Sequence, residues 1–160
     1  MNHDENNIMV ILSSPSGAGK TTICSQLREE LIKIGVSKEK IFHIDGDDLR
    51  EIILNKDYSE KGRRSNIETA MSIASFLSNK KFIVLVSLVS PYLDLREKFK
   101  EKNNVLEFYL HTSQVRGKEQ FWVDNYQAPK SNYTEIITDK KIEENINEIL
   151  NVYRKMATLA

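Results

Sequence analysis

The chain contains few of the residues that mark extracellular, membrane or disordered proteins. Its 160 residues include one cysteine, Cys24, which excludes an internal disulfide and suits a reducing compartment. Only three prolines and six glycines occur, and there is no linker, repeat or low-complexity segment. No apolar run reaches the ~20 residues of a membrane span, and the polar N-terminus is unlike a signal peptide. We therefore expect one domain over residues 1–160, in the cytoplasm, without a membrane partner.

Charge is abundant but has no net sign. The 23 Lys and Arg residues balance 23 Asp and Glu residues. Without an excess of either sign, electrostatics favours neither nucleic acid nor an anionic membrane as partner. No group of His and Cys residues has the spacing of metal ligands, so we expect no zinc site.

Short apolar runs alternate with amphipathic stretches along the chain. We expect strands at residues 8–12, 41–44, 82–86, 105–110 and 135–138, and helices at 21–34, 49–54, 63–78, 92–102 and 140–156. This alternation predicts an α/β fold of the P-loop NTPase type, with a mostly parallel sheet between two layers of helices. Ligands of such folds bind at the carboxyl ends of the strands. Residues 1–7 are expected to form a flexible tail, residues 56–62 a polar loop and residues 111–131 a lid.

A glycine-rich segment, SSPSGAGKTT at residues 13–22, follows the first predicted strand directly. It matches the phosphate-binding loop G-x-x-x-x-G-K followed by Ser or Thr, except that Ser14 replaces the first glycine. Gly17 and Gly19 allow the backbone to curl and to point its N–H groups at phosphate oxygens. The segment therefore predicts a nucleoside triphosphate site.

The polar residues of this segment suit ATP and Mg²⁺ as cofactors. Lys20 would reach the β- and γ-phosphates, and the hydroxyl of Thr21 would bind Mg²⁺ at the start of the helix. The predicted ATP-binding residues are Ser16, Gly17, Ala18, Gly19, Lys20, Thr21 and Thr22.

Acidic residues follow the second predicted strand, in the sequence Asp45-Gly46-Asp47. A phosphoryl-transfer enzyme needs an acid to orient Mg²⁺ or to accept a proton from the acceptor hydroxyl. The strand at 82–86 ends in Ser87, not in the usual metal-linked acid, so Asp45 or Asp47 would substitute for it. We expect Thr21 and Asp45 to hold the metal. The alternative is that Asp47 or Asp48 only caps the following helix.

These motifs occur in an order that resembles the adenylylsulfate kinases, which phosphorylate the 3′-hydroxyl of adenosine 5′-phosphosulfate with ATP. The matching segments are GAGKTT, DGD followed by Leu49-Arg50, Tyr58-Ser59, Arg63 with Asn66-Ile67, VSPY ending at Tyr92, and YQAP beginning at Tyr126. The similarity extends from about Ile8 to Thr138. The resemblance implies a kinase that transfers the γ-phosphoryl group to a hydroxyl of a small nucleotide.

The resemblance also implies roles for residues outside the phosphate loop. It makes Asp47 the candidate base, and it places Arg50, Arg63 and Asn66 against the acceptor, with Tyr58 stacked on the acceptor base. Arginine forks suit a phosphate–sulfate group, and a tyrosine ring offers a stacking face. On residue type alone, a solvated helix face is the favoured interpretation of both arginines.

Ser90 and Phe121 complete the implied site. The resemblance places Ser90 near the acceptor and assigns it a phosphoserine intermediate, which in-line transfer does not require; Ser90 could also simply end a strand. Phe121 would sandwich the acceptor base or pack the lid. The implied catalytic residues are Lys20, Asp47 and Ser90, and the implied acceptor-binding residues are Asp45, Asp47, Arg50, Tyr58, Arg63, Asn66, Ser90 and Phe121.

Departures from the family pattern leave the acceptor open. Gly62 stands where the family has Asp, and the R-D-P-K-G-L-Y segment is absent, which shortens the lid. Arg116 and Lys118 in this lid either stabilise transition-state charge or are exposed cations, and Trp122 has no assigned role. Adenosine 5′-phosphosulfate is the first choice of acceptor. The alternatives are cytidine diphosphoramidate or another small alcohol, or a regulatory protein that binds nucleotide without transfer. A homodimer stays open, because dimers occur among the relatives.

Overall fold

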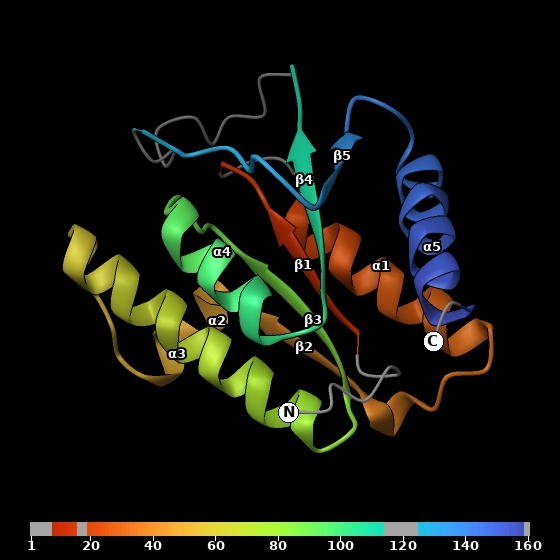
Figure 1. Cartoon of the computed structure of the whole chain (residues 1–160), viewed down its shortest axis with the longest axis horizontal. Helices are drawn as coiled ribbons and strands as arrows, with labels where there is room; N and C mark the ends of the chain where they lie inside the picture. Colours follow the sequence, from red (N-terminus) through yellow and green to blue (C-terminus); the bar gives the residue numbers. More distant parts are fainter. Residues whose placement is uncertain (1–7, 16–18, 114–124, 159–160) are drawn as a thin grey trace.

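The computed structural model describes residues 8–15, 19–113 and 125–158, and these form a parallel sheet between helices (Figure 1). The strands are β1 Met9–Ser13, β2 Ile41–Asp45, β3 Ile83–Leu88, β4 Val105–His111 and β5 Tyr133–Ile137. The helices are α1 Lys20–Lys33, α2 Gly46–Ile52, α3 Glu60–Asn79, α4 Leu93–Lys102 and α5 Ile142–Thr158, with one 3₁₀ turn at Lys38–Lys40. The predicted α/β fold of the P-loop NTPase type is confirmed.

The sheet has the order β2-β3-β1-β4-β5, and every neighbouring pair is parallel. The register places Ser13 opposite Leu88, and Asp45 opposite Ser87. The carboxyl ends of β1, β2 and β3 therefore meet at one edge of the sheet, which is where ligands of doubly wound sheets bind.

Each face of the sheet carries its own core, because side chains alternate between the faces along a strand. Val10 and Leu12 of β1 pack with α1 and α5, whereas Met9 and Ile11 pack with α2, α3 and α4. Figure 1 shows α1 and α5 on one side of the sheet and the other three helices on the opposite side. Strands buried on both faces explain the continuous apolar runs in the sequence.

Two helices, α2 and α3, begin a full three residues earlier than the apolar pattern predicts, at Gly46 instead of 49 and at Glu60 instead of 63. The prediction started one helix at residue 49, but α2 begins at Gly46 because the Asp45 carboxylate accepts hydrogen bonds from the main-chain N–H groups of Asp47 and Asp48. The predicted loop at 56–62 is also wrong at its end. There Ser59 caps α3 by accepting a hydrogen bond from the N–H of Gly62 over 3.2 Å.

The lid prediction is corrected at its start. His111 is the last residue of β4, where it pairs with Ile137 of β5, so it belongs to the sheet. Residues 114–124, most of the predicted lid, lie outside the described residues, as does the predicted tail at 1–7.

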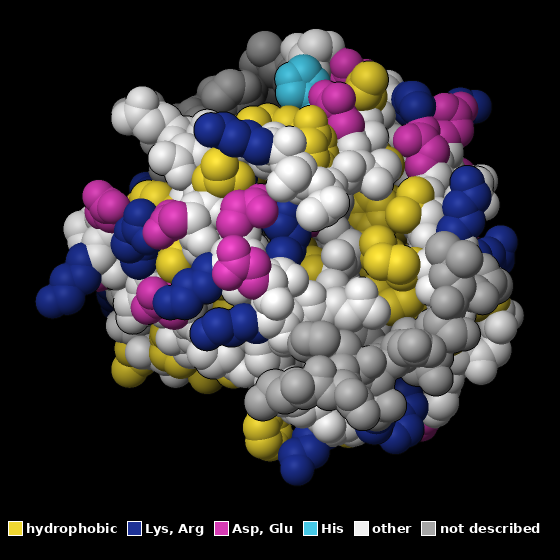
Figure 2. Space-filling model, viewed as in Figure 1, with side chains coloured by type: hydrophobic (Ala, Val, Ile, Leu, Met, Phe, Trp, Pro, Cys, Tyr) yellow, Lys and Arg dark blue, Asp and Glu magenta, His cyan; other side chains and the backbone are white. Residues whose placement is uncertain are grey.

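The surface over α3 and α4 mixes both signs of charge. Figure 2 shows Lys and Arg side chains interspersed with Asp and Glu on this face. Arg64 of α3, for example, pairs with Glu60 over 3.0 Å and with Asp94 of α4 over 2.9 Å. Among the helices that the structure describes, none is both long enough and apolar enough to cross a membrane.

Candidate active site

The phosphate-loop segment joins the end of β1 to the start of α1. Gly19, the residue before the helix, has φ +85°, a left-handed conformation that glycine adopts without strain. Among the described residues, no side chain caps this helix, so its first N–H groups could bind an anion. The predicted ATP-binding residues Ser16, Gly17 and Ala18 lie outside the described residues.

Ser14, which departs from the motif, interacts with Lys20, the lysine of the same motif. The ammonium of Lys20 donates to Ser14 Oγ over 3.1 Å, and Ser14 Oγ donates to the carbonyl oxygen of Pro15 over 2.7 Å. Among the described residues, Ser14 is not one of the non-glycine residues with positive φ, so the replacement imposes no left-handed strain. The sequence marked Ser14 only as a mismatch and did not indicate this contact.

The two predicted metal-binding residues are in direct contact. Thr21 Oγ1 donates a hydrogen bond to Asp45 Oδ2 over 2.7 Å, which joins the first turn of α1 to the end of β2. Both side chains offer the oxygen donors that Mg²⁺ prefers. Within the described residues, no cluster of three or more His, Cys, Asp and Glu side chains could hold a metal ion by itself. Mg²⁺ here would therefore depend on phosphate oxygens and water as additional ligands.

Asp45 is surrounded by hydrogen-bond donors. Its Oδ1 accepts from the N–H groups of Asp47 and Asp48, and its Oδ2 accepts from Thr21 and Ser87. Partial burial raises the pKa of Asp45, but these hydrogen bonds outweigh it and hold the pKa below its ordinary value. Asp45 is therefore a carboxylate at neutral pH, as a metal-binding residue must be.

The helix-capping alternative is corrected by this geometry. Asp45, rather than Asp47 or Asp48, caps α2. The side chains of Asp47 and Asp48 are exposed on the first turn of the helix. Asp47 is thus not used for capping and lies on the ligand edge of the sheet, one residue beyond Gly46.

Three of the residues implied for the acceptor form one cluster. The guanidinium carbon of Arg50 lies 4.4 Å from the centre of the Tyr58 ring, and that of Arg63 lies 5.9 Å from it. Arg63 Nε also donates to the carbonyl oxygen of Tyr58 over 2.7 Å, and Arg50 Nη1 to that of Asp57 over 3.1 Å. Tyr58 is 63% exposed, which leaves it open to a ligand.

The loop that carries Tyr58 is folded tightly over the start of α3. Asn55 Nδ2 donates to the carbonyl oxygen of Gly62 over 3.0 Å. A Cβ added to Gly62 would lie 2.5 Å from Asp57 Cβ and closer still to the Asp57 carbonyl oxygen. Only glycine fits at this position, so the departure from the family's Asp has a local packing reason.

Asn66 and Ser90 are buried beneath the site. Asn66 Nδ2 donates to the carbonyl oxygen of Gly46 over 3.3 Å, which braces α3 against the start of α2. Ser90 has no exposed surface. Among the described residues, Asn66 Oδ1 and Ser90 Oγ are buried without a hydrogen-bond partner. Buried side-chain oxygens normally have a partner, so both atoms could still form a hydrogen bond.

A buried arginine that the sequence did not single out holds the Ser90 segment. Arg96 of α4 donates to the carbonyl oxygens of Ser90 and Gln127, and its Nε lies 3.2 Å from Glu107 Oε1. Both charged side chains are 1% exposed. The contact ties the segment after β3 to Gln127, in the last part of the predicted lid at 111–131. The sequence offered one sign of this ion pair, because Glu107 interrupts the apolar strand predicted at 105–110.

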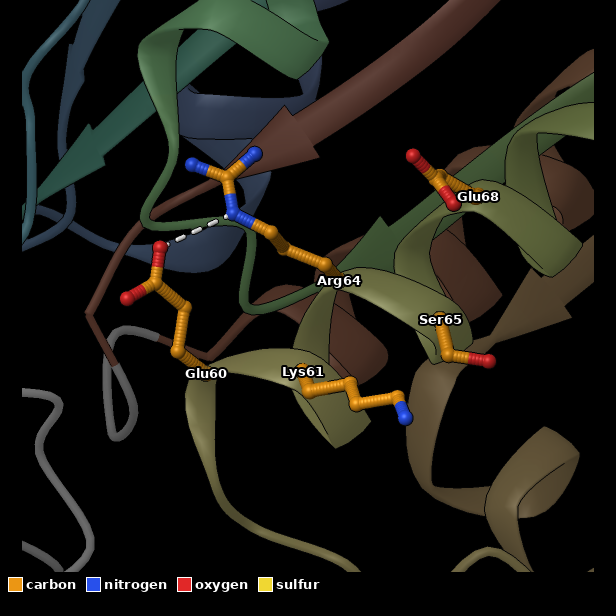
Figure 3. Close-up of a pocket in the computed structure, with 5 residues that line it drawn as sticks. All are labelled: Glu60, Lys61, Arg64, Ser65 and Glu68. Atoms are coloured by element: carbon orange, nitrogen blue, oxygen red, sulfur yellow. Dashed lines mark hydrogen bonds and ion pairs between the residues drawn. The ribbon is translucent and has the colours of Figure 1, made fainter.

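The remaining predicted lid residues, Phe121 with Arg116, Lys118 and Trp122, lie outside the described residues. A separate surface depression is lined by residues of α3 alone: Glu60, Lys61, Arg64, Ser65 and Glu68 (Figure 3). Neither Lys20, Thr21 nor Asp45 lines it, and Arg64 is engaged there by Glu60. The phosphate-loop edge of the sheet is therefore the stronger site.

The fold and the site define the chain as a P-loop protein, with a phosphate loop between the first strand of a parallel sheet and a helix. A family model described as adenylylsulphate kinase matches residues 6–131. The chain belongs to the adenylylsulphate kinase family.

Individual relatives differ in how much they share with the chain. A probable adenylyl-sulfate kinase of Pyrococcus abyssi is 34% identical over 102 residues, which cover 62% of this chain and 57% of the relative. The adenylyl-sulfate kinase of Rippkaea orientalis is 27% identical over 98% of this chain and 96% of the relative. The chain thus spans little more than half the length of the first of these proteins and nearly all of the second.

A solved structure shares the fold. The APS kinase of Mycobacterium tuberculosis in complex with AMPPNP and APS superposes with a TM-score of 0.77, over 91% of this chain and 96% of that one. The two sequences are 22% identical, so this likeness concerns the fold.

Proposed function

We propose that the protein is an ATP-dependent kinase that transfers the γ-phosphoryl group to a hydroxyl of a small nucleotide. The first choice of acceptor is adenosine 5′-phosphosulfate, at its 3′-hydroxyl. The observation that carries the proposal is the contact between Thr21 and Asp45, 2.7 Å apart, directly after a phosphate loop in a chain of the adenylylsulphate kinase family.

The donor end of the site would be formed by the phosphate loop and the start of α1. Lys20 would leave Ser14 to contact the β- and γ-phosphates, and the α1 N-terminus would bind phosphate oxygens. Thr21 and Asp45 would hold Mg²⁺, which would neutralise the charge that accumulates on the transferring group. Ser16, Gly17, Ala18, Gly19 and Thr22 belong to the same proposed ATP site.

The acceptor end would be formed by α2, the loop before α3 and the segment after β3. Asp47, exposed beside the metal-binding pair, would accept the proton of the acceptor hydroxyl. The guanidinium groups of Arg50 and Arg63 would bind the acceptor's anionic groups, and the exposed ring of Tyr58 would stack on its base. Asn66, Ser90 and Phe121 complete the proposed acceptor site. Ser90 has no exposed surface in this structure, so its proposed contact with the acceptor requires the segment after β3 to move; in-line transfer needs no covalent intermediate on it.

A second candidate acceptor keeps the reaction and changes the nucleotide. It is favoured by Gly62, because the Asp57 loop occupies the space where the family pattern has an aspartate side chain. If the loop beside Arg50 and Tyr58 differs from that of the family, the surface available to the acceptor base differs as well. Cytidine diphosphoramidate represents this class. A regulatory protein that binds nucleotide without transfer is the third outcome.

A panel assay separates these functions. ADP release is measured with ATP and Mg²⁺ in the presence of adenosine 5′-phosphosulfate, cytidine diphosphoramidate and small alcohols, one at a time. Release that depends on adenosine 5′-phosphosulfate supports the proposal, and release with only a cytidine compound replaces the acceptor. ATP binding with no acceptor-dependent release would overturn the kinase in favour of the regulatory protein.

A matched pair of lysine variants shows whether the activity belongs to this site. Lys20→Ala is expected to abolish ADP release, whereas Lys33→Ala removes an exposed lysine of the same helix and should leave it unchanged. Equal turnover by the two variants would contradict the mechanism. We also propose a cytoplasmic protein, supported by the single buried cysteine, and a homodimer as the state to test by light scattering.

A further inference from the structure

A histidine and a serine on neighbouring strands contact the carboxylate of Asp45. His43 and Asp45 are two residues apart on β2, so their side chains lie on the same face of the sheet. Ser87 of β3 is the register partner of Asp45. Ser87 Oγ lies 2.6 Å from His43 Nε2 and 3.0 Å from Asp45 Oδ2.

The direction of these hydrogen bonds follows from their donors. A carboxylate only accepts, so Ser87 must use its single hydroxyl proton on Asp45. Ser87 can then only accept from His43, which requires the proton of the imidazole to be on Nε2. The result is a directed chain, from His43 to Ser87 to Asp45, that ends on the same oxygen that Thr21 contacts.

Packing does not explain why these two residues are polar. Ser87 is 2% exposed and lies within the otherwise apolar strand β3, beside the buried thiol of Cys24. A small apolar residue would fill this space without needing a hydrogen bond. The hydroxyl and the imidazole satisfy each other and leave one donor for Asp45.

We propose that His43 and Ser87 are positioning residues for the Asp45–Thr21 pair. This inference rests on the proposed function. The two main-chain N–H groups of α2 hold Oδ1, and Ser87 holds Oδ2, so the carboxylate plane is fixed from both sides. Removing the Ser87 donor leaves Oδ2 with Thr21 as its one remaining donor among the described residues, so the carboxylate is held less firmly. Removing His43 frees the Ser87 hydroxyl to turn away.

The first test needs no activity. Long-range ¹H–¹⁵N NMR of the ligand-free protein, at a pH where imidazole is neutral, reports which ring nitrogen carries the proton. We expect the Nε2–H tautomer for His43, assigned by the loss of its signals in His43→Gln. In Ser87→Ala, the tautomers should become mixed. An Nδ1–H tautomer in the wild-type protein would overturn the proposal.

The second test measures metal affinity with nucleotide, by electron paramagnetic resonance of Mn²⁺ in the presence of ADP. Ser87→Ala and His43→Leu are expected to weaken Mn²⁺ binding by roughly 10-fold, the low end for partners of a metal-binding residue. His43→Gln keeps a donor at the place of Nε2 and should retain wild-type affinity. Ser75→Ala, which removes a hydroxyl bonded to Asn103 instead, is the control.

The outcomes distinguish this proposal from the proposed function. Wild-type Mn²⁺ affinity in both Ser87→Ala and His43→Leu, with unchanged thermal stability, would overturn the positioning role and leave the kinase intact. The predicted loss of affinity in a protein that releases no ADP with any acceptor would overturn the kinase and leave the positioning role intact.

Discussion

Thr21 and Asp45 are joined by a hydrogen bond of 2.7 Å, although most of α1 and the 3₁₀ turn lie between them in the chain. The bond places a hydroxyl and a carboxylate at the edge of the sheet, beside the phosphate loop. The acid at this edge therefore comes from β2, because the neighbouring strand β3 has Ser87 opposite Asp45.

Asp45 can be tested with a substitution that keeps its capping role. Asn caps helices about as well as Asp, so Asp45→Asn should remain folded while losing the negative charge. We expect turnover to fall by at least the roughly 10- to 100-fold that removing a partner of a metal-binding residue costs, with a thermal midpoint close to that of the wild type. Asp48→Asn, an exposed acid of the same helix turn, is the control. Equal turnover in both variants would exclude Asp45 from the site.

Gly62→Ala should lower the free energy of unfolding, whereas the same substitution within an ordinary helix raises it. Within a helix, replacing Gly by Ala usually stabilises by about 1 kcal/mol. Here the new Cβ would overlap Asp57, so we expect a loss of about 1–3 kcal/mol in the free energy of unfolding. Urea denaturation measures it, with Ser72→Ala on the exposed side of α3 as control. A stabilised Gly62→Ala would show that the Asp57 loop is not packed against α3.

Arg96→Met tests the buried ion pair beneath Ser90. The variant leaves Glu107 without its arginine, so we expect a loss of about 3–5 kcal/mol, reduced to the extent that Lys100, 3.0 Å from Glu107, compensates. Arg96→Met combined with Glu107→Gln should recover part of the loss. If the loss of stability in the double variant equals the sum of the losses in the two single variants, Arg96 and Glu107 are not directly coupled. Arg28→Met, on the surface, should change the midpoint little.

The pair formed by Asp94 and Arg64 predicts a dependence of stability on pH. Hydrogen bonds from Arg64 hold the pKa of Asp94 below its ordinary value of 3.8. The unfolded state therefore binds a proton first, so the stabilisation is complete above that value and is lost as the pH falls through the folded pKa. Asp94→Asn should show a shallower loss of stability in this acid range, measured by thermal midpoints. Parallel curves for both proteins would contradict the prediction.

The sequence predicted the elements well but missed the beginnings of two helices. Periodicity is carried by apolar residues, and the first turns of α2 and α3 contain almost none, because their first residues are stabilised by the caps Asp45 and Ser59. A capping side chain can be recognised only when the N–H group that it binds is known. The polar first turns of α2 and α3 were therefore not predicted as helical.

The candidate site was predicted in its residue types and only partly in its contacts. The phosphate loop, Thr21 and Asp45 follow from a motif and from their place after a strand, and their roles with Mg²⁺ stay predictions. The contacts of Ser14, Arg96 and His43 were not predicted. Arg96 and Glu107 look like separate surface charges, since nothing local shows that both point into the same buried space.

The sequence by itself determined the class of fold and the presence of a phosphate site, because both depend on local patterns of apolar residues and glycine. The tertiary structure alone decided which side chains meet. His43, Asp45 and Ser87 come together through the parallel register of β2 on β3, where Asp45 lies opposite Ser87. A slip of one residue would turn each side chain to the other face of the sheet, and that register is set by packing over the whole strand pair.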